Sequence, residues 1–244
     1  MLLYQNQHLE RCPLKHHPFT GDFQLDQLAS GPRHLIHGDD HDTAISSILA
    51  LRRGPISYSR NKVIVCEGDP TDYMFVVVKG VVRTCKTFKD GSRSVAGFHV
   101  PGELIGQNGE LKYSLSTEAA TDTMVSFLKC SALLSLAAQD NRVANFLLNQ
   151  TANKLRRAQE HALLIGRSAK CRVATFLIDL SNRMGQTKYL ELPMPHHDIA
   201  DYLGLKIETV SRTITELERS GVIARASSRT VVLRDRASLM RIMA

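Results

Sequence analysis

The stretch that decides the C-terminal fold is Asp198-Ile-Ala-Asp-Tyr-Leu-Gly-Leu-Lys-Ile-Glu-Thr-Val-Ser-Arg212. Apolar residues recur through it and beyond it at helical spacing, and Gly204 interrupts them. The pattern therefore predicts one helix over 198–203 and a second over 207–220. Two short helices joined through a glycine form a helix-turn-helix. The residues expected to share its core are Ile199, Ala200, Leu203, Val210, Ile214 and Leu217.

The opposite face of the second helix begins with short or forked polar groups, namely Glu208, Thr209, Ser211 and Arg212. In a major groove, arginine chelates guanine O6 and N7, glutamate accepts from cytosine N4, and an apolar side chain such as Ile207 touches a thymine methyl. The face therefore predicts binding to double-stranded DNA. Taken alone, a polar helix face is more often merely solvated. A module that docks on protein would instead expose apolar anchors.

A β-hairpin is predicted behind these helices, from apolar segments at 221–224 and 230–233 around a turn at 226–229. It would form the wing of a winged helix-turn-helix, with Arg225 and Arg229 suited to phosphate contact. Residues 167–244 carry 13 Lys and Arg against 8 Asp and Glu. Most of the positive charge therefore lies in this predicted domain, which begins with a helix over 169–184.

A single long helix is predicted over 141–166. Six of its residues are spaced 3, 4, 3, 4 and 3 apart, which is the a/d seam of a coiled coil. They are Leu148, Thr151, Leu155, Ala158, Ala162 and Ile165. A helix with such a seam between two domains indicates a homodimer. The alternative is that the stripe packs on the chain's own β domain, because the small side chains of Ala158 and Ala162 permit either.

Residues 51–140 show the shorter period of strands, rich in Val, Ile, Phe and Thr. Strands are expected at 56–65, 72–78, 81–88, 92–100 and 123–128. Their connections carry turn residues, as at Lys79-Gly80 and Asp90-Gly91. This region predicts an antiparallel β-barrel or jelly roll.

Residues 1–50 are rich in histidine and broken by glycine and proline, so a loose arm is expected that becomes a short helix near 43–51. His34, His37 and His41 are spaced so that they could hold a metal on one helical face. Gly31-Pro32 and Gly38 break any helix there, so no metal site is predicted.

The whole chain has 244 residues, with 31 Lys and Arg against 24 Asp and Glu. Such a composition is that of a globular protein, and the basic excess favours polyanionic partners. The longest apolar run, 73–78, is far short of the roughly 20 residues that cross a bilayer, and no signal-peptide pattern is present. A cytoplasmic protein without membrane contact is therefore expected. The five cysteines form no CxxC pair, so neither a disulfide framework nor a zinc site is predicted.

The stretch 198–212, followed by Leu217-Glu-Arg-Ser-Gly-Val-Ile223, closely resembles the DNA-binding signature of the Crp/Fnr superfamily of bacterial transcription regulators, and most of all its FixK-like branch. The turns at 67–69 and 101–106 match that family's cyclic-nucleotide-binding-type β-roll, and Arg157-Ala-Gln-Glu-His161 resembles its FixK-type dimer helix. The resemblance implies an α+β chain with a β-roll, a long dimerisation helix and a C-terminal winged helix-turn-helix.

The resemblance also implies a function. A homodimer would insert one recognition helix per subunit into a TTGAT-N4-ATCAA-type palindrome and recruit RNA polymerase as an activator. The genes would concern microoxic respiration, denitrification or nitrogen fixation. By motif position, the residues contacting bases would be Ile207, Glu208, Ser211 and Arg212, with Arg212 on the guanine and Glu208 on its paired cytosine. The expected contacts to the DNA backbone are Lys206, Thr209, Arg225 and Arg229.

Departures from the family pattern bear on what the protein senses. Cyclic-AMP binding would need an Arg-Ser pair where this chain has Leu115-Ser116, and a buried cyclic phosphate without that Arg lacks its counter-ion. The Glu that binds the ribose in that branch is also missing from 106–109. An iron–sulfur cluster would need several N-terminal cysteines, whereas only Cys12 is there and Ser126 stands at the central cysteine position. No cofactor is therefore expected.

An effector-gated sensor is the alternative. Its signal would be haem held by the N-terminal histidines, a small ligand in the β-roll, or oxidation of Cys171, whose neighbours Lys170 and Arg172 are cations of the kind that raise thiol reactivity. Lys206 occupies the expected N-cap position of the recognition helix, where loss of a Thr cap costs about 1 kcal/mol and a phosphate contact would offset it. The chain has no G-x-S-x-G, Walker loop or HExxH motif, so an enzyme is not expected.

Overall fold

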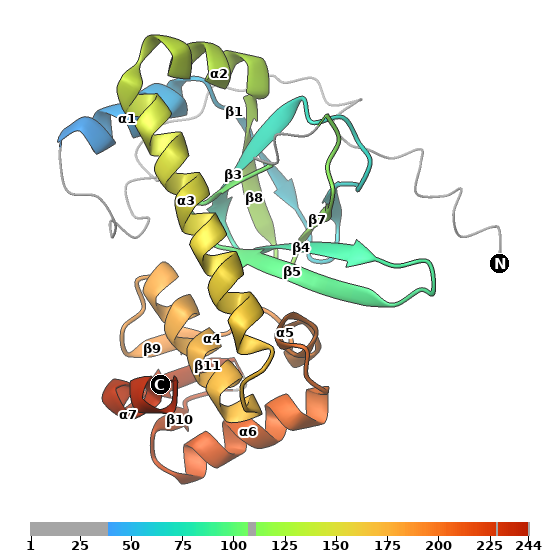
Figure 1. Cartoon of the computed structure of the whole chain (residues 1–244), viewed down its shortest axis with the longest axis vertical. Coiled ribbons are helices and arrows are strands. Elements are labelled where there is room, and N and C mark those ends of the chain that lie inside the picture. Colours follow the sequence, from blue (N-terminus) through green and yellow to red (C-terminus); the bar gives the residue numbers. More distant parts are fainter. Residues whose placement is uncertain (1–38, 107–110, 228, 244) are drawn as a thin grey trace.

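The computed structural model describes residues 39–106, 111–227 and 229–243. A β-roll and a mainly helical C-terminal domain lie along one long helix, α3 (Asn141–Leu164), which runs beside both of them (Figure 1). The α+β architecture expected from the sequence is thereby confirmed. His34 and His37, which were considered above as metal ligands and not predicted to be such, lie outside the described residues. None of the described helices is long and apolar enough to cross a membrane.

The β-roll consists of two four-stranded antiparallel sheets. One sheet has the order β1 (Arg53–Tyr58), β8 (Thr123–Lys129), β3 (Tyr73–Lys79) and β6 (Leu104–Ile105). The other has the order β2 (Val63–Val65), β7 (Ser116–Ala119), β4 (Val82–Thr87) and β5 (Arg93–His99). Apolar side chains from both sheets fill the space between them, and the rings of Phe75 and Phe127 meet edge to face with centroids 5.1 Å apart.

Four of the expected strands form within one residue of their predicted ends. The prediction of one strand over 56–65 is wrong, because the chain turns at Asn61, which has a φ of 66°, and divides into β1 and β2. Strands β6 and β7 were not predicted, since one has two residues and the other is the polar run Ser-Thr-Glu-Ala. The Lys79-Gly80 turn needs its glycine: φ is +79°, and a Cβ there would lie 2.4 Å from the Asp122 carbonyl oxygen.

Two helices pack with the start of α3 at the far end of the β-roll. They are α1 (Asp39–Ala50), which begins before its predicted position, and α2 (Cys130–Gln139), which was not predicted. Buried Ile48, Leu133 and Val143 join the three helices in one small core. Asp140 separates α2 from α3, and its side chain accepts a hydrogen bond from the Arg142 amide as the N-cap of α3.

The C-terminal domain contains the predicted helix-turn-helix and wing. Its elements are α4 (Ala169–Arg183), β9 (Tyr189–Glu191), α5 (His196–Leu203), α6 (Ile207–Arg219), β10 (Ile223–Arg225), β11 (Thr230–Leu233) and α7 (Arg236–Met243). Gly204 ends α5 in the left-handed conformation, with a φ of 61°, as the predicted break requires. Strand β9 and helix α7 were not predicted. Strand β9 completes the wing sheet, whose order is β10-β11-β9, and α7 packs against α4.

Candidate DNA-binding interface

Helix α6 is held in place by a continuous apolar core beneath it. The six residues expected to share this core are all buried, with exposures of 3% or less. They connect α6 to α5 and α4, so the predicted core of the helix-turn-helix is confirmed.

The outer face of α6 presents the side chains that were expected to contact bases. Ile207 is 42% exposed, and Glu208 and Arg212 are exposed one turn apart. Neither Glu208 nor Arg212 forms an ion pair with any residue in the described part of the chain, although their i, i+4 spacing would allow one. Ser211 is half-buried, and its hydroxyl lies 3.3 Å from Nδ1 of His196 on α5. Three hydrogen-bonding or charged groups are thus gathered at the start of one exposed helix.

The four residues predicted to contact the DNA backbone surround this face. They differ in exposure and in the partners that their side chains already have. Lys206 is the N-cap residue of α6, as expected, and its side chain makes no capping hydrogen bond. Thr209 is half-buried. On the wing, the Arg225 guanidinium is held by Glu218 at 3.3 Å and by Thr215, whereas the Arg229 side chain is exposed. Arg229 is therefore the wing arginine that can turn to a phosphate without breaking an ion pair to any described residue.

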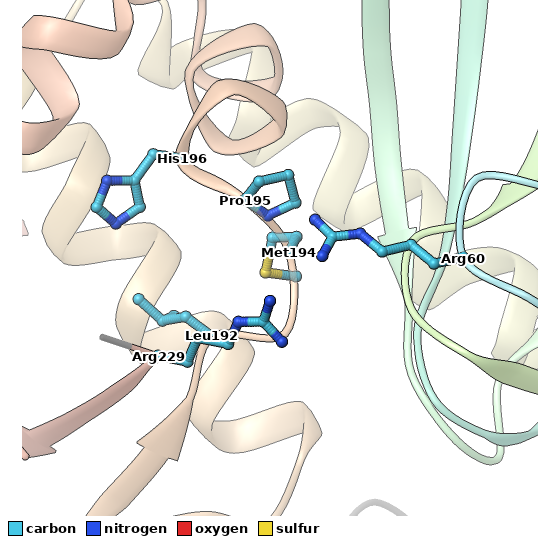
Figure 2. Close-up of a pocket in the computed structure, with 6 residues that line it drawn as sticks. All are labelled: Arg60, Leu192, Met194, Pro195, His196 and Arg229. Carbon is cyan, nitrogen blue, oxygen red and sulfur yellow. The ribbon is translucent and has the colours of Figure 1, made fainter. Parts of the chain in front are cut away.

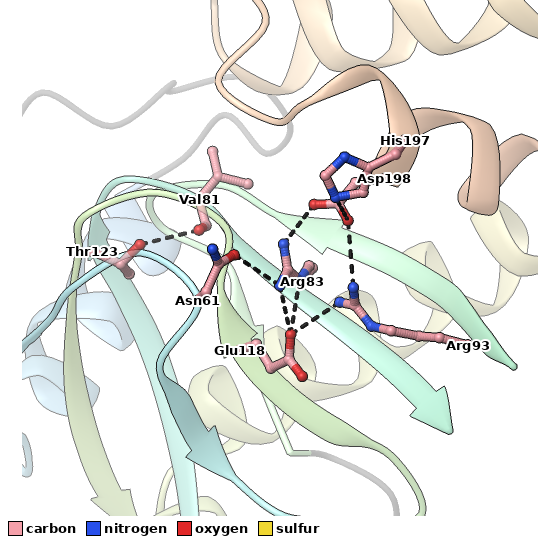
Figure 3. A network of polar contacts seen from close by, with 8 residues as sticks. All are labelled: Asn61, Val81, Arg83, Arg93, Glu118, Thr123, His197 and Asp198. Carbon is pink, nitrogen blue, oxygen red and sulfur yellow. Dashed lines mark hydrogen bonds and ion pairs between the residues drawn. The ribbon is translucent and has the colours of Figure 1, made fainter. Parts of the chain in front are cut away.

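A buried network of ion pairs fastens α5 to the β-roll (Figure 3). The Asp198 carboxylate, which is 0% exposed, accepts a hydrogen bond of 2.6 Å from Arg83 of β4. Arg93 of β5 lies 3.6 Å from its other oxygen, and both arginines bind Glu118 of β7. His197 is also 3.3 Å from Asp198. The first helix of the helix-turn-helix is therefore bound to the sheet that contains β4, β5 and β7. The ion pairs involve charges that neither domain could bury alone.

A second charged cluster surrounds Glu103, beyond the strand β5. Arg183 of α4 donates to Glu103 at 2.8 Å and also to the Phe98 carbonyl oxygen, and Arg157 of α3 lies 3.2 Å from the same carboxylate. Burial alone would raise the pKa of Glu103, but the Arg183 guanidinium holds it below its ordinary value. Burial also lowers the pKa of neighbouring His99 to about 3, so that imidazole is neutral at pH 7. The cluster connects α3, α4 and the β-roll.

Helix α3 has two different faces. Val143, Lys154 and Arg157 lie on the face toward the chain's own body, where Val143 is fully buried. All six residues of the predicted a/d seam lie on the other face and are exposed, with Leu148 at 66%, Leu155 at 60% and Ile165 at 59%. In the single chain the seam therefore does not pack on the β-roll.

Possible effector sites are only partly within the described residues. Cys171 is 2% exposed, and its thiol lies 3.8 Å from the Met243 carbonyl oxygen. Ser126, which stands where a cluster ligand would be expected, is buried. No three His, Cys, Asp or Glu side chains of the described ranges come together as a metal site. The segment 107–109, compared above with a nucleotide-binding turn, lies outside those ranges.

Sequence reasoning gave no role to Arg83, Asp198 or His196. Asp198 opens the quoted stretch, but an acidic residue in the first turn of a helix is already explained by the helix dipole. Its partner Arg83 is 115 positions away on an alternating strand, where an arginine is expected to face solvent. Only the packing of the two domains shows that both are buried.

Comparisons with known proteins agree with this geometry. Residues 171–242 match the model of a Crp-like helix-turn-helix domain, and residues 55–140 match that of a cyclic nucleotide-binding domain. The chain is 40% identical to the nitrogen fixation regulation protein FixK of Azorhizobium caulinodans, over 83% of this chain and 84% of that protein. It is 31% identical to the transcriptional activator protein FnrL of Cereibacter sphaeroides, over 94% and 89% of the two chains. The structure of FixK2 from Bradyrhizobium japonicum superimposes with a TM-score of 0.74 at 40% identity, covering 78% of this chain and 97% of that one.

Proposed function

The chain belongs to the Crp/Fnr family of transcription regulators, and from that premise we propose that it acts as a homodimeric activator that binds a TTGAT-N4-ATCAA-type palindrome. The observation that carries the proposal is the exposed start of α6, where Glu208 and Arg212 stand one turn apart without an ion pair to any described residue. A Glu and an Arg in this arrangement can bind the two bases of one G·C pair. Arg212 would chelate guanine O6 and N7 while Glu208 accepts from cytosine N4.

The half-site also contains A·T pairs, which suit the remaining residues of the face. Ile207 is 42% exposed at the first position of α6, where it can touch a thymine methyl. Ser211 can donate to a base edge from its position beside His196. Lys206 and Arg229 would fix the register by phosphate contacts, which carry no sequence information themselves.

The exposed seam of α3 supports a homodimer. Three large apolar side chains in that seam are each about three-fifths exposed in the single chain. Packing a second α3 against it would cover them and place two α6 helices on one side of the dimer, as a palindrome requires. As their names state, the relatives regulate nitrogen fixation or activate transcription. The genes proposed here are those of nitrogen fixation, denitrification and microoxic respiration, with RNA polymerase as the recruited partner.

No small effector is needed in this proposal. Leu115 and Ser116 stand where a cyclic phosphate would need an Arg-Ser pair, and the Ser116 hydroxyl already accepts from the Glu67 amide at 3.0 Å. The residues described in this part of the β-roll therefore do not fit a cyclic nucleotide. The competing candidate is a thiol switch at Cys171, and the burial of that side chain speaks against ready oxidation.

Fluorescence anisotropy tests the proposal with purified protein and no added ligand. One labelled duplex carries TTGAT-N4-ATCAA, and the other carries the same sequence with the G·C pair of each half-site inverted. The proposal predicts selective binding to the first at ~150 mM salt, with or without reductant. Selectivity that appears only with reductant would support the thiol switch instead. Equal binding of both duplexes would contradict the proposed half-site.

A further inference from the structure

An open pocket of about 240 Å³ lies between the β-roll and the DNA-binding domain (Figure 2). Arg60, from the turn between β1 and β2, forms one wall, and Arg229 of the wing forms the opposite one. The remainder is lined by Leu192, Met194, Pro195 and His196. The two guanidinium groups point toward each other across Met194 and Pro195 (Figure 2).

The pocket is cationic without a balancing carboxylate. None of its six lining residues is acidic, and neither arginine forms an ion pair within the described ranges. Nε of Arg60 is buried and has no hydrogen-bond partner among the described residues. Asp122 is close by, but its carboxylate accepts from the backbone amide of Arg60 at 2.9 Å. Two facing guanidinium groups repel each other unless an anion lies between them, and a phosphate can take hydrogen bonds from both.

The position of the pocket indicates which anion is available. His196 contributes to its wall and also lies 3.3 Å from the hydroxyl of Ser211 on α6. The pocket therefore adjoins the base-contacting face. A duplex with its major groove on α6 brings the phosphates that border the groove to this part of the surface.

We propose that the Arg60–Arg229 pocket binds a backbone phosphate of the DNA, so that the β-roll as well as the winged helix contacts the duplex. This inference rests on the proposed function of α6 and extends it. Arg60 would supply a positioning contact that is independent of sequence. Since phosphate contacts release counterions, it would appear in the salt dependence of binding and not in the choice of base.

The test compares Arg60→Gln with the matched control Arg53→Gln. Arg53 is the first residue of β1 and lies outside the pocket, whereas Arg60 is in the turn that follows β1, so both variants lose one positive charge from the same part of the β-roll. Binding of the full chain to a 40-base-pair duplex is measured by anisotropy between 50 and 200 mM KCl. For Arg60→Gln the slope of log K against log [KCl] should become shallower by up to about 1.8, because each phosphate contributes about 0.9, a dimer has two pockets, and Arg229 alone holds the phosphate less well. The control should keep the wild-type slope.

Further variants and ligands make each outcome decisive. Arg60→Lys keeps the charge and should restore the slope, and Arg60→Gln should weaken a palindromic and a scrambled duplex by the same factor. A wild-type slope in a folded Arg60→Gln protein would overturn the inference.

The other outcomes concern free phosphate and the wild type. If inorganic phosphate raises the melting temperature of the wild type but not that of Arg60→Gln, while both proteins have the same DNA slope, the pocket binds a free anion and not the DNA. Wild-type protein that binds DNA without preferring the palindrome would contradict the proposed half-site while leaving the slope comparison valid. A wild type that binds no duplex would overturn both.

Discussion

Truncation of Leu155 to alanine should strongly weaken association of the chain with itself. Leu155 is in the middle of the α3 seam and is 60% exposed in the single chain. Full burial of a leucine side chain is worth about 1.5–3 kcal/mol, so covering the exposed part contributes about 1–2 kcal/mol, most of which alanine would lose. A seam residue meets its own copy in a parallel two-stranded coiled coil, so the dimer loses about 2–3 kcal/mol. The dissociation constant should rise about 30- to 150-fold.

Leu163 on the same helix gives a matched control. It is 77% exposed, more than Leu155, but it lies outside the seam at a position that would face away from a partner helix. Sedimentation equilibrium of both alanine variants, with circular dichroism to show that each is folded, measures the effect. Leu163→Ala should associate like the wild type. If both variants keep the wild-type dissociation constant, or if both weaken it equally, the assignment of the seam as the dimer interface is wrong.

Three further predictions concern residues in the interior of the protein. Arg83→Met should destabilise the fold by about 3 kcal/mol in urea unfolding, since it removes the 2.6 Å hydrogen bond of the buried Asp198 carboxylate and leaves it the longer contacts to His197 at 3.3 Å and Arg93 at 3.6 Å, and the double variant Arg83→Met/Asp198→Leu should recover much of that loss. No recovery would show that the pair is not coupled. Stability should fall as pH drops below about 6.5, the ordinary pKa of histidine, because burial lowers the pKa of His99 in the fold to about 3 and the unfolded chain takes up the proton first. His99→Gln should reduce the difference in urea midpoint between pH 7.5 and 5.5, and an unchanged difference would exclude His99 as its source. Cys171, at 2% exposure, should react with a thiol reagent much more slowly in the native protein than in urea, and equal rates would favour the redox alternative.

The helix-turn-helix and most of the β-roll could be predicted because local chemistry and long-range packing agree there. Gly204 is needed for the left-handed end of α5, and apolar residues at helical spacing on both sides of it face one core. The start of α6 could likewise be predicted, since the residues that do not face the core must face outward. Helix α7 has eight residues and strands β6, β7 and β9 have two to four, which is too short for a helical or strand period to be recognised in the sequence.

The contacts between the domains could not be predicted from local pattern. Arg83 and Asp198 are each typical surface residues, and their burial depends on two domains meeting in a particular orientation. The same is true of Arg60 and Arg229, which lie 169 positions apart and become one pocket only in the folded chain. Periodicity identifies which face of an element is polar, but it does not identify the element that will cover it.

The central claim, that Arg212 binds the guanine of the half-site, is tested most directly by combining one substitution in the protein with one change in the DNA. Wild type and Arg212→Ala are each titrated against the TTGAT-N4-ATCAA duplex and against the duplex with both G·C pairs inverted, at the same salt concentration. If Arg212 binds the guanine, its loss costs about 1–3 kcal/mol on the first duplex, or about 5- to 150-fold in Kd, and little on the second. Equal losses on both duplexes would contradict the assignment and leave Arg212 as a phosphate contact.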